Sequence, residues 1–166
     1  MLDTLKYVIQ NNLLAGLVLA LIVSGVITDP SQLLGKVNET DLQYLSGEME
    51  IENGNYGGNE LNDMNRLLLT GSVPLNRMES PKWKGNTIEE VIMAKEGRFW
   101  QYAEVTRKGF KTKKASTRTK LLAKYLLIYG PVCPKNVVYQ GQSKNGSGVY
   151  ASIPVKGDKN ELFCYE

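Results

Sequence analysis

The chain has 166 residues, a formal net charge of +3, and no histidine. This length is enough for one domain with a substantial hydrophobic core. The lack of histidine excludes Ser-His-Asp and Cys-His catalytic arrangements and every zinc site with a histidine ligand. Two cysteines cannot form a four-thiolate zinc site, so we expect no metal and no cofactor. The small net charge gives no argument for nucleic-acid binding, and we expect none.

The first strongly apolar segment runs from Leu13 to Ile27 and contains no charged residue. A spanning helix needs about 20 apolar residues, and the neighbouring residues could extend the segment toward that length. We therefore expect residues 1–28 to form a hydrophobic helix that anchors the protein in the cell membrane. A cleaved secretory signal and a buried core helix are the alternatives. Lys6 before the segment favours a single-pass orientation with the rest of the chain extracytoplasmic, or secreted if the segment is cleaved.

Residues 29–39 contain proline and glycine and are interpreted as a linker. The soluble domain is therefore expected to cover residues 40–166. Its first helix is predicted to begin at Thr40, because Thr40 and Gln43 form the pattern of a capping box. Asn53 and the glycine after it predict the end of this helix.

The rest of the chain is predicted to contain helices first and strands last. Helical spacing of apolar residues continues over residues 60–80, 87–97 and 116–129. Pro74 in the first of these predicts a bend near Thr70. Short segments rich in Val, Ile, Tyr and Phe predict strands over residues 136–140, 148–155 and 161–165, the last two paired as a hairpin. This order predicts an α+β fold with a helical core and a small C-terminal antiparallel sheet.

Glu48 is the first candidate catalytic residue. Leu42, Leu45 and Met49 form an apolar stripe on the first helix of the domain, and Glu48 lies at the edge of that stripe. We expect it to be half buried, where desolvation raises a carboxyl pKa and produces a general acid that works near neutral pH. The alternative is a solvated glutamate on an exposed helix flank. Glu52 lies one turn later, which is too close for it to flank a glycosidic bond opposite Glu48.

Several short motifs follow one another in a recognisable order. They are Leu45-Ser46-Gly47-Glu48, Val73-Pro74-Leu75-Asn76-Arg77, Ser80-Pro81-Lys82-Trp83, Asn86-Thr87-Ile88-Glu89-Glu90-Val91-Ile92 and Gly97-Arg98-Phe99. Together with Val138-Tyr139 and Leu162-Phe163, this set resembles the SleB-type cell-wall hydrolases, which include spore-cortex-lytic enzymes. The resemblance covers residues 40–165.

The resemblance implies a lysozyme-like domain that cleaves the glycan strands of peptidoglycan, with Glu48 as the catalytic residue. It implies lytic transglycosylation, in which one carboxyl serves first as acid and then as base. Asn76 and Arg77 are expected to shape the substrate cleft. Four aromatic residues are candidates for stacking on sugar rings: Phe99, Trp100, Tyr102 and Tyr139.

Two alternatives to this function stay open, together with the state of the two cysteines. One alternative is a hydrolysing muramidase, and the other is a wall-binding or membrane protein that keeps the fold without activity. In each case the partner is peptidoglycan or the membrane, and we expect a monomer. Cys133 and Cys164 could form a disulfide outside the cytoplasm, or be two small buried side chains.

Overall fold

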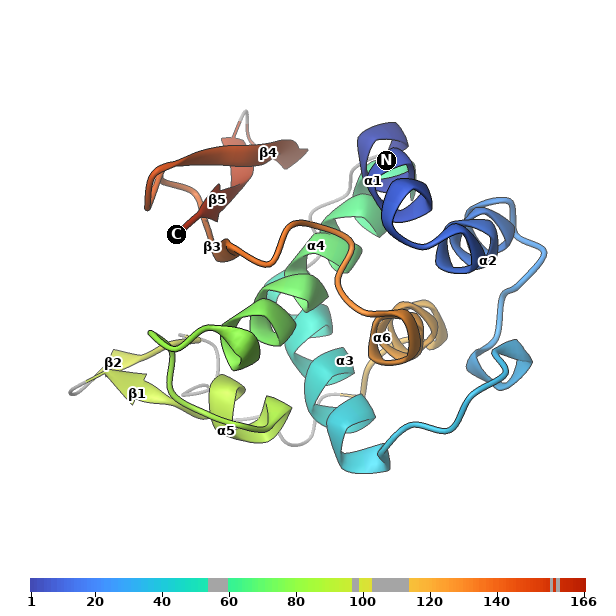
Figure 1. Cartoon of the computed structure of the whole chain (residues 1–166), viewed down its shortest axis with the longest axis horizontal. Coiled ribbons are helices and arrows are strands. Elements are labelled where there is room, and N and C mark those ends of the chain that lie inside the picture. Colours follow the sequence, from blue (N-terminus) through green and yellow to red (C-terminus); the bar gives the residue numbers. More distant parts are fainter. Residues whose placement is uncertain (54–59, 97–98, 103–113, 156, 158) are drawn as a thin grey trace.

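The computed structural model describes residues 1–53, 60–96, 99–102, 114–155, 157 and 159–166 (Figure 1). The helices are α1 (Leu2–Asn11), α2 (Leu13–Val23), α3 (Glu39–Asn53), α4 (Glu60–Glu79), α5 (Ile88–Ile92) and α6 (Thr117–Tyr129), with a 3-10 turn, η1 (Pro30–Gln32). The strands are β1 (Lys95–Glu96), β2 (Phe99–Trp100), β3 (Val137–Gly141), β4 (Gly148–Val155) and β5 (Lys159–Tyr165). The predicted α+β class is confirmed.

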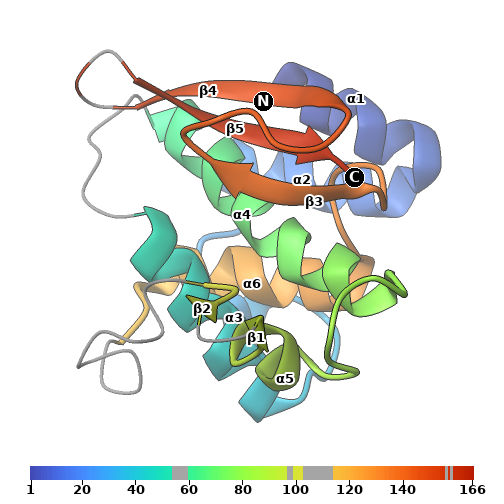
Figure 2. The ribbon, with the colours of Figure 1, turned by 90° about the vertical axis from the view of Figure 1, so that its left-hand side faces the viewer.

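The three C-terminal strands form an antiparallel sheet in the order β3-β5-β4. The predicted pairing of the last two strands is confirmed, with Val155 opposite Lys159 at the hairpin end and Gly148 opposite Tyr165 at the other. β5 is therefore the central strand. The sheet lies along one side of α4, away from α3 and α6 (Figure 2). A second, two-stranded ladder joins β1 to β2 beside α5.

The N-terminal segment folds as two short helices, so the prediction of one hydrophobic helix over residues 1–28 is wrong. Asn12 has an extended backbone between α1 and α2, and its side chain accepts a hydrogen bond from the Ala15 N–H. α2 ends at Val23, because Gly25 adopts a φ of 76° that leaves the helix. Within the part of the chain that is described, no helix is both long enough and apolar enough to cross a membrane.

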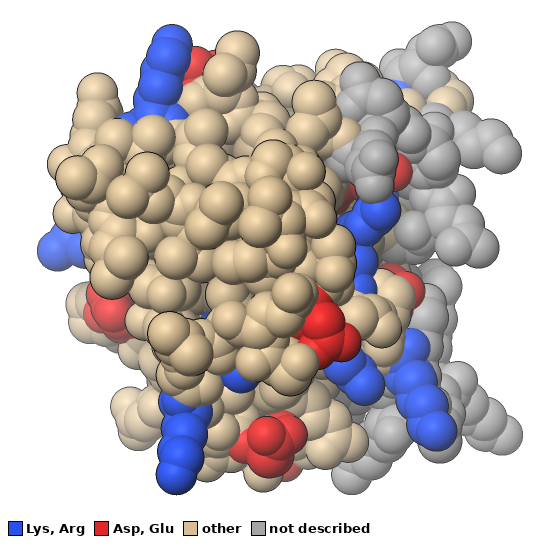
Figure 3. Space-filling view, turned by 90° about the vertical axis from the view of Figure 1, so that its right-hand side faces the viewer, with Lys and Arg blue, Asp and Glu red and all other residues tan. Residues whose placement is uncertain are grey.

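Both N-terminal helices pack on the body of the protein. Val8 of α1 and Leu19 of α2 belong to the same hydrophobic core as the later helices. The Tyr125 hydroxyl of α6 donates a hydrogen bond to the Ala15 carbonyl, at 3.1 Å. The opposite side of α1 and α2 faces outward, and Figure 3 views the molecule from this side.

The segment interpreted as a linker is also attached to the core. Asp29 and Gln32 form a capping box around η1. The Lys124 ammonium of α6 donates hydrogen bonds to the carbonyls of Pro30 and Leu33, at 2.9 and 3.1 Å. Leu33 is buried. These contacts fix the path of the chain from α2 to α3.

The start of α3 differs from the prediction by a few residues. The helix begins at Glu39, and the Asn38 side chain accepts a hydrogen bond from the Thr40 N–H at 2.8 Å. Asn38 is therefore the capping residue, and the predicted capping box at Thr40 is wrong. Asparagine at this position satisfies the free N–H groups of the first turn as well as threonine does.

Pro74 does not break α4, which runs as one helix from Glu60 to Glu79 with the proline inside it. The ring of Pro74 removes one helical hydrogen bond. Packing outweighs this loss, since residues 67–77 are all buried. The Ser72 hydroxyl also links α4 to the chain after α6, because it donates to the Leu68 carbonyl and accepts from the Val132 N–H.

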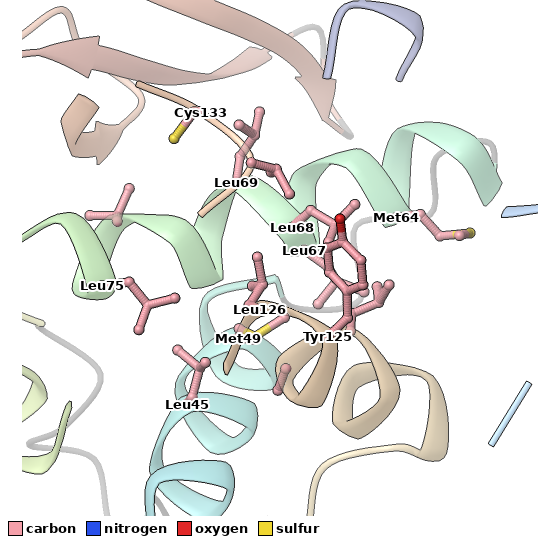
Figure 4. Close-up of a cluster of buried hydrophobic side chains, with 14 of the residues drawn as sticks. Leu45, Met49, Met64, Leu67, Leu68, Leu69, Leu75, Tyr125, Leu126 and Cys133 are labelled. Carbon is pink, nitrogen blue, oxygen red and sulfur yellow. The ribbon is translucent and has the colours of Figure 1, made fainter. Parts of the chain in front are cut away.

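The core lies where α3, α4 and α6 meet (Figure 4). Leu45 and Met49 of α3 face Leu68 of α4 and Leu126 of α6, and all four side chains are almost completely buried. α6 occupies nearly its predicted range, with Ser116 as its capping residue. Glu50 of α3 receives hydrogen bonds from the Ser116 N–H and the Thr119 hydroxyl, which fixes the start of α6 on α3. This core holds α3 rigidly around Glu48.

Candidate active site

Glu48 lies in the middle of α3, one residue before the core residue Met49. Its side chain is 1% exposed, and neither carboxyl oxygen has a hydrogen-bond partner among the described residues. The structure therefore buries Glu48 more completely than the half burial expected from the sequence. An ionised carboxylate without hydrogen bonds is very unfavourable in such a place, so the neutral acid is the stable form.

Two charged side chains influence Glu48 besides its burial. Desolvation raises the pKa of Glu48 well above its ordinary value, and the charge of Glu52 one turn later raises it further. The positive charge of Arg77 opposes both effects. Burial is the largest cause, so the carboxyl keeps its proton at a pH where an exposed glutamate is ionised.

Arg77, in the last turn of α4, joins Glu48 to a group of aromatic rings. Its Cζ atom lies 4.0 Å from the centre of the Trp83 ring and 4.8 Å from the centre of the Tyr102 ring. Its Nε donates a hydrogen bond to the Val138 carbonyl of β3 at 2.8 Å. Arg77 is 6% exposed, so these contacts are desolvated cation–π interactions, which are stronger than exposed ones.

Tyr102 is a candidate aromatic residue whose ionisation is influenced by Glu48. Its side chain is 5% exposed, and its phenol is electrostatically coupled to Arg77, Glu48 and Glu52. Burial raises the pKa of Tyr102 far above its ordinary value, while Arg77 lowers it in part. Tyr102 is therefore a neutral hydroxyl at every physiological pH, beside a neutral carboxyl and a buried cation.

A pocket of about 220 Å³ is lined in part by Trp83, the ring on which Arg77 stacks. Trp83 and Tyr139 line it with their rings edge to face, 5.6 Å between centres. The remaining lining residues are polar or charged: Lys82, Lys84, Lys95, Gln101 and Glu166. Lys82 forms an ion pair with Glu166 at 3.7 Å. Aromatic rings beside hydrogen-bonding groups are the lining expected of a sugar-binding pocket.

Asn76 lies next to Arg77 but faces the sheet. Its side chain is 1% exposed, and its Nδ2 donates hydrogen bonds of 2.9 Å to the carbonyls of Pro134 and Val137. These bonds tie the end of α4 to the start of β3. Asn76 therefore has a positioning role: it joins α4, which carries Arg77, to β3, which carries Tyr139.

Other residues singled out from the sequence lie outside this group. Phe99 and Trp100 form β2, but their side chains lie outside the described part of the structure. Cys133 and Cys164 are both buried and not linked, so the structure shows two separate thiols and no disulfide. Burial raises the pKa of the Cys133 thiol to about 12, so it is not a nucleophile. No group of three or more acidic or cysteine ligands able to hold a metal occurs in the described ranges.

Three residues of the site were not singled out as site residues from sequence. Trp83 belongs to the Ser80-Pro81-Lys82-Trp83 motif, but that motif does not indicate a binding role for it. Gln101 and Glu166 line the pocket from distant segments, and nothing in the sequence marks them as neighbours. Their roles follow only from the fold, which brings the ends of α4, β2 and β5 together.

The burial of Glu48 predicts a pH-dependent stability. Its pKa is raised in the folded chain, so stability is highest below the unfolded value near 4.5 and falls as the pH rises toward the folded value. The expected loss is about 1.4 kcal/mol for each pH unit between the two values. Glu48→Gln removes this dependence, so urea unfolding should show the variant gaining stability relative to the wild type from pH 4 to pH 8. A difference that does not change with pH would contradict the buried neutral acid.

Comparison with protein-family models, curated proteins and solved structures finds no match for this chain. The resemblance to the SleB-type hydrolases therefore rests on the ordered motifs alone.

Proposed function

We propose that the protein is a peptidoglycan-cleaving glycosidase that acts on glycan strands with Glu48 as general acid and base, at the outer side of the cell membrane. The observation that carries this proposal is the Glu48 carboxyl itself, which is buried, has no hydrogen-bond partner among the described residues and has a raised pKa. Burial of this kind is costly to the fold and is concentrated at catalytic sites.

The fold supports this proposal through its arrangement of helices. Glu48 lies on α3, which packs against α4, α5 and α6, while the small sheet and the β1-β2 ladder flank the helices. A helical core with a buried acidic residue and a small sheet is compatible with the lysozyme-like domain that the resemblance implies. Arg77, whose charge acts on Glu48, stacks on Trp83, and Trp83 lines a surface pocket together with Tyr139.

The proposed reaction is lytic transglycosylation. The protonated Glu48 carboxyl donates its proton to the glycosidic oxygen as the bond from that oxygen to the anomeric carbon breaks. The resulting carboxylate accepts the proton of the primary hydroxyl of the same muramic residue, whose oxygen forms a new bond to the anomeric carbon. Glu48 ends protonated as it began, water is not consumed, and no second carboxylate is required.

The pocket beside Arg77 suits a charged glycan. Trp83 and Tyr139 offer ring faces and edges to a sugar, and Lys82 and Lys84 bring positive charge to the rim. Peptidoglycan carries carboxylates on its peptide stems, so these lysines attract the polymer through space. The attraction is expected to weaken as salt is added.

A second candidate function is a non-catalytic wall-binding protein, and one observation favours it. Glu48 is 1% exposed, so a glycan can touch the carboxyl only after neighbouring side chains move. A protein that only binds glycan could use the Trp83 and Tyr139 pocket without any such movement. In that case the buried neutral acid Glu48 and the buried cation Arg77 would have no catalytic role.

Digestion of purified peptidoglycan distinguishes these functions. A glycosidase releases soluble glycan fragments and produces new glycan ends without new free amino groups. A peptide-cleaving enzyme would produce free amino groups instead, and a binding protein would sediment with the wall without releasing soluble material. The proposal expects new glycan ends, and either of the other outcomes would contradict it.

A further inference from the structure

The outer surface of α1 and α2 is made of large apolar side chains. Of the ten large hydrophobic residues that are exposed among the described side chains, eight lie within the first 34 residues. Six of them come from the two helices, with exposures from 39% to 73%: Leu2, Ile9, Leu13, Leu14, Leu17 and Leu21. Figure 3 shows a broad uncharged area on this side of the molecule, with Lys, Arg, Asp and Glu at its margins.

α2 has two apolar faces, and the protein covers only one. Ala15, Leu19 and Ile22 point into the core, while Leu13, Leu17 and Leu21 lie one turn apart on the other side. A helix that is apolar all round normally has apolar surroundings on every side. Soluble monomers rarely leave so many neighbouring apolar side chains in water, so this face is expected to bind a partner.

The composition of the face indicates lipid. Its large exposed side chains are aliphatic, with no aromatic ring among them. The cores of protein–protein interfaces are instead enriched in aromatic residues, methionine and arginine. Leucine and isoleucine side chains match the acyl chains of a bilayer, which offer dispersion contacts and no hydrogen bonds.

The charge of the face agrees with an anionic lipid surface. Lys6 is exposed and lies between Leu2 and Ile9 on the outer side of α1, at spacings of four and three residues. Asp3, also exposed, lies about 60° further round that helix, and α2 carries no charge at all. A lysine in this place can bury its methylene groups with the leucines and extend its ammonium to lipid phosphates.

We propose that α1 and α2 dock flat on a bilayer that contains anionic lipid, with the leucine face of α2 inserted among the headgroups and upper acyl chains. The inner face of α2 stays packed against the core, so the helix lies in the plane of the membrane. This arrangement would hold the rest of the protein at the membrane surface. It does not depend on the proposed glycosidase activity.

Flotation with lipid vesicles tests this proposal on the whole chain. The wild type is expected to float with vesicles of phosphatidylglycerol and phosphatidylcholine, and to float less with pure phosphatidylcholine. Leu14→Gln/Leu17→Gln should reduce binding by about tenfold or more, because two leucines no longer enter the acyl region. Lys6→Glu should remove the preference for the anionic vesicles. Val149→Gln, which changes an exposed apolar residue of β4, is the matched control and should bind like the wild type.

Two results would overturn the proposal. The first is a failure of flotation: the wild type stays with the unbound fraction, or the double variant floats as well as the wild type. For the double variant, circular dichroism must show that it is folded. The other is a wild type that forms dimers in light scattering and does not float, with Leu14→Gln/Leu17→Gln monomeric. That outcome would assign the face to a second copy of the chain.

Discussion

Replacing Glu48 by glutamine is expected to lower the rate of peptidoglycan lysis by about a thousandfold or more, since positioned acid–base catalysis contributes about 10²–10⁴ at each proton transfer. Glutamine has nearly the same shape, but it cannot donate a proton and take one back. The side chain is buried and has no hydrogen-bond partner in the described part of the chain, so the substitution should not disrupt packing. Release of soluble glycan from purified walls measures the effect.

Glu52→Gln is the matched control for this experiment. Glu52 lies one turn from Glu48 on the same helix, and its charge raises the pKa of Glu48. Removing that charge should leave most activity in place and shift the alkaline limb of the pH profile, where Glu48 loses its proton, to lower pH. A folded Glu48→Gln protein that still lyses walls would remove Glu48 from the mechanism, and equal losses in both variants would indicate a general effect on α3.

Gly71→Ala is expected to destabilise the fold by about 1–3 kcal/mol, which is the typical cost of inserting a methyl group into a filled core. A Cβ atom on Gly71 would lie 2.5 Å from Leu126 Cδ1 and 2.6 Å from Met49 Sδ. These atoms belong to α6 and α3, so the glycine marks the place where three helices touch. The midpoint of urea unfolding measures the loss.

Gly47→Ala is the same change in a place with room for it. Nothing lies within 4 Å of a Cβ atom built on Gly47, in the middle of α3. Alanine should therefore stabilise the helix by about 0.5–1 kcal/mol, through its higher helix propensity. The two variants should move the unfolding midpoint in opposite directions. Shifts of the same sign would show that the helices are not packed as described.

Much of the fold could be predicted from local signals. Ser116 before a run of helical spacing and Gly130 after it predicted α6, and the structure confirms both ends. The alternation and β-branched content of the C-terminal segments predicted β3, β4 and β5 and the pairing of the last two. These signals depend only on residues close together in the sequence, so the folded structure keeps the local conformations that they predict.

The outcome differed from the sequence pattern where packing between distant segments or a local turn intervened. Pro74 is a helix breaker by itself, but the buried surroundings of α4 keep the helix continuous. The uncharged segment from Leu13 to Ile27 has the composition of a membrane span. The extended backbone at Asn12 and the turn at Gly25 limit its helix to residues 13–23, and the core covers one face of it. Neither the packing around Pro74 nor the packing of α2 on the core can be inferred from the spacing of apolar residues alone.

The site was predictable only in part. The apolar stripe on the helix around Glu48 predicted a half-buried carboxyl with a raised pKa; the structure buries the side chain almost completely, and this burial raises its pKa. The stacking of Arg77 on Trp83 and Tyr102 joins three separate segments, so no sequence pattern indicates it. Asn76 was predicted in the cleft, and its amide instead bonds carbonyls near the start of β3.

Mass spectrometry of the glycan ends released from peptidoglycan tests the central claim most directly. With the wild type, the account predicts muramic ends that lack one water relative to ordinary reducing ends, because the primary hydroxyl of the muramic residue closes the ring. With Glu48→Gln, it predicts no such ends above the untreated wall. Ordinary reducing ends from the wild type would show that the enzyme hydrolyses the glycosidic bond and does not perform transglycosylation. The absence of any new glycan ends would contradict a glycosidase that uses Glu48.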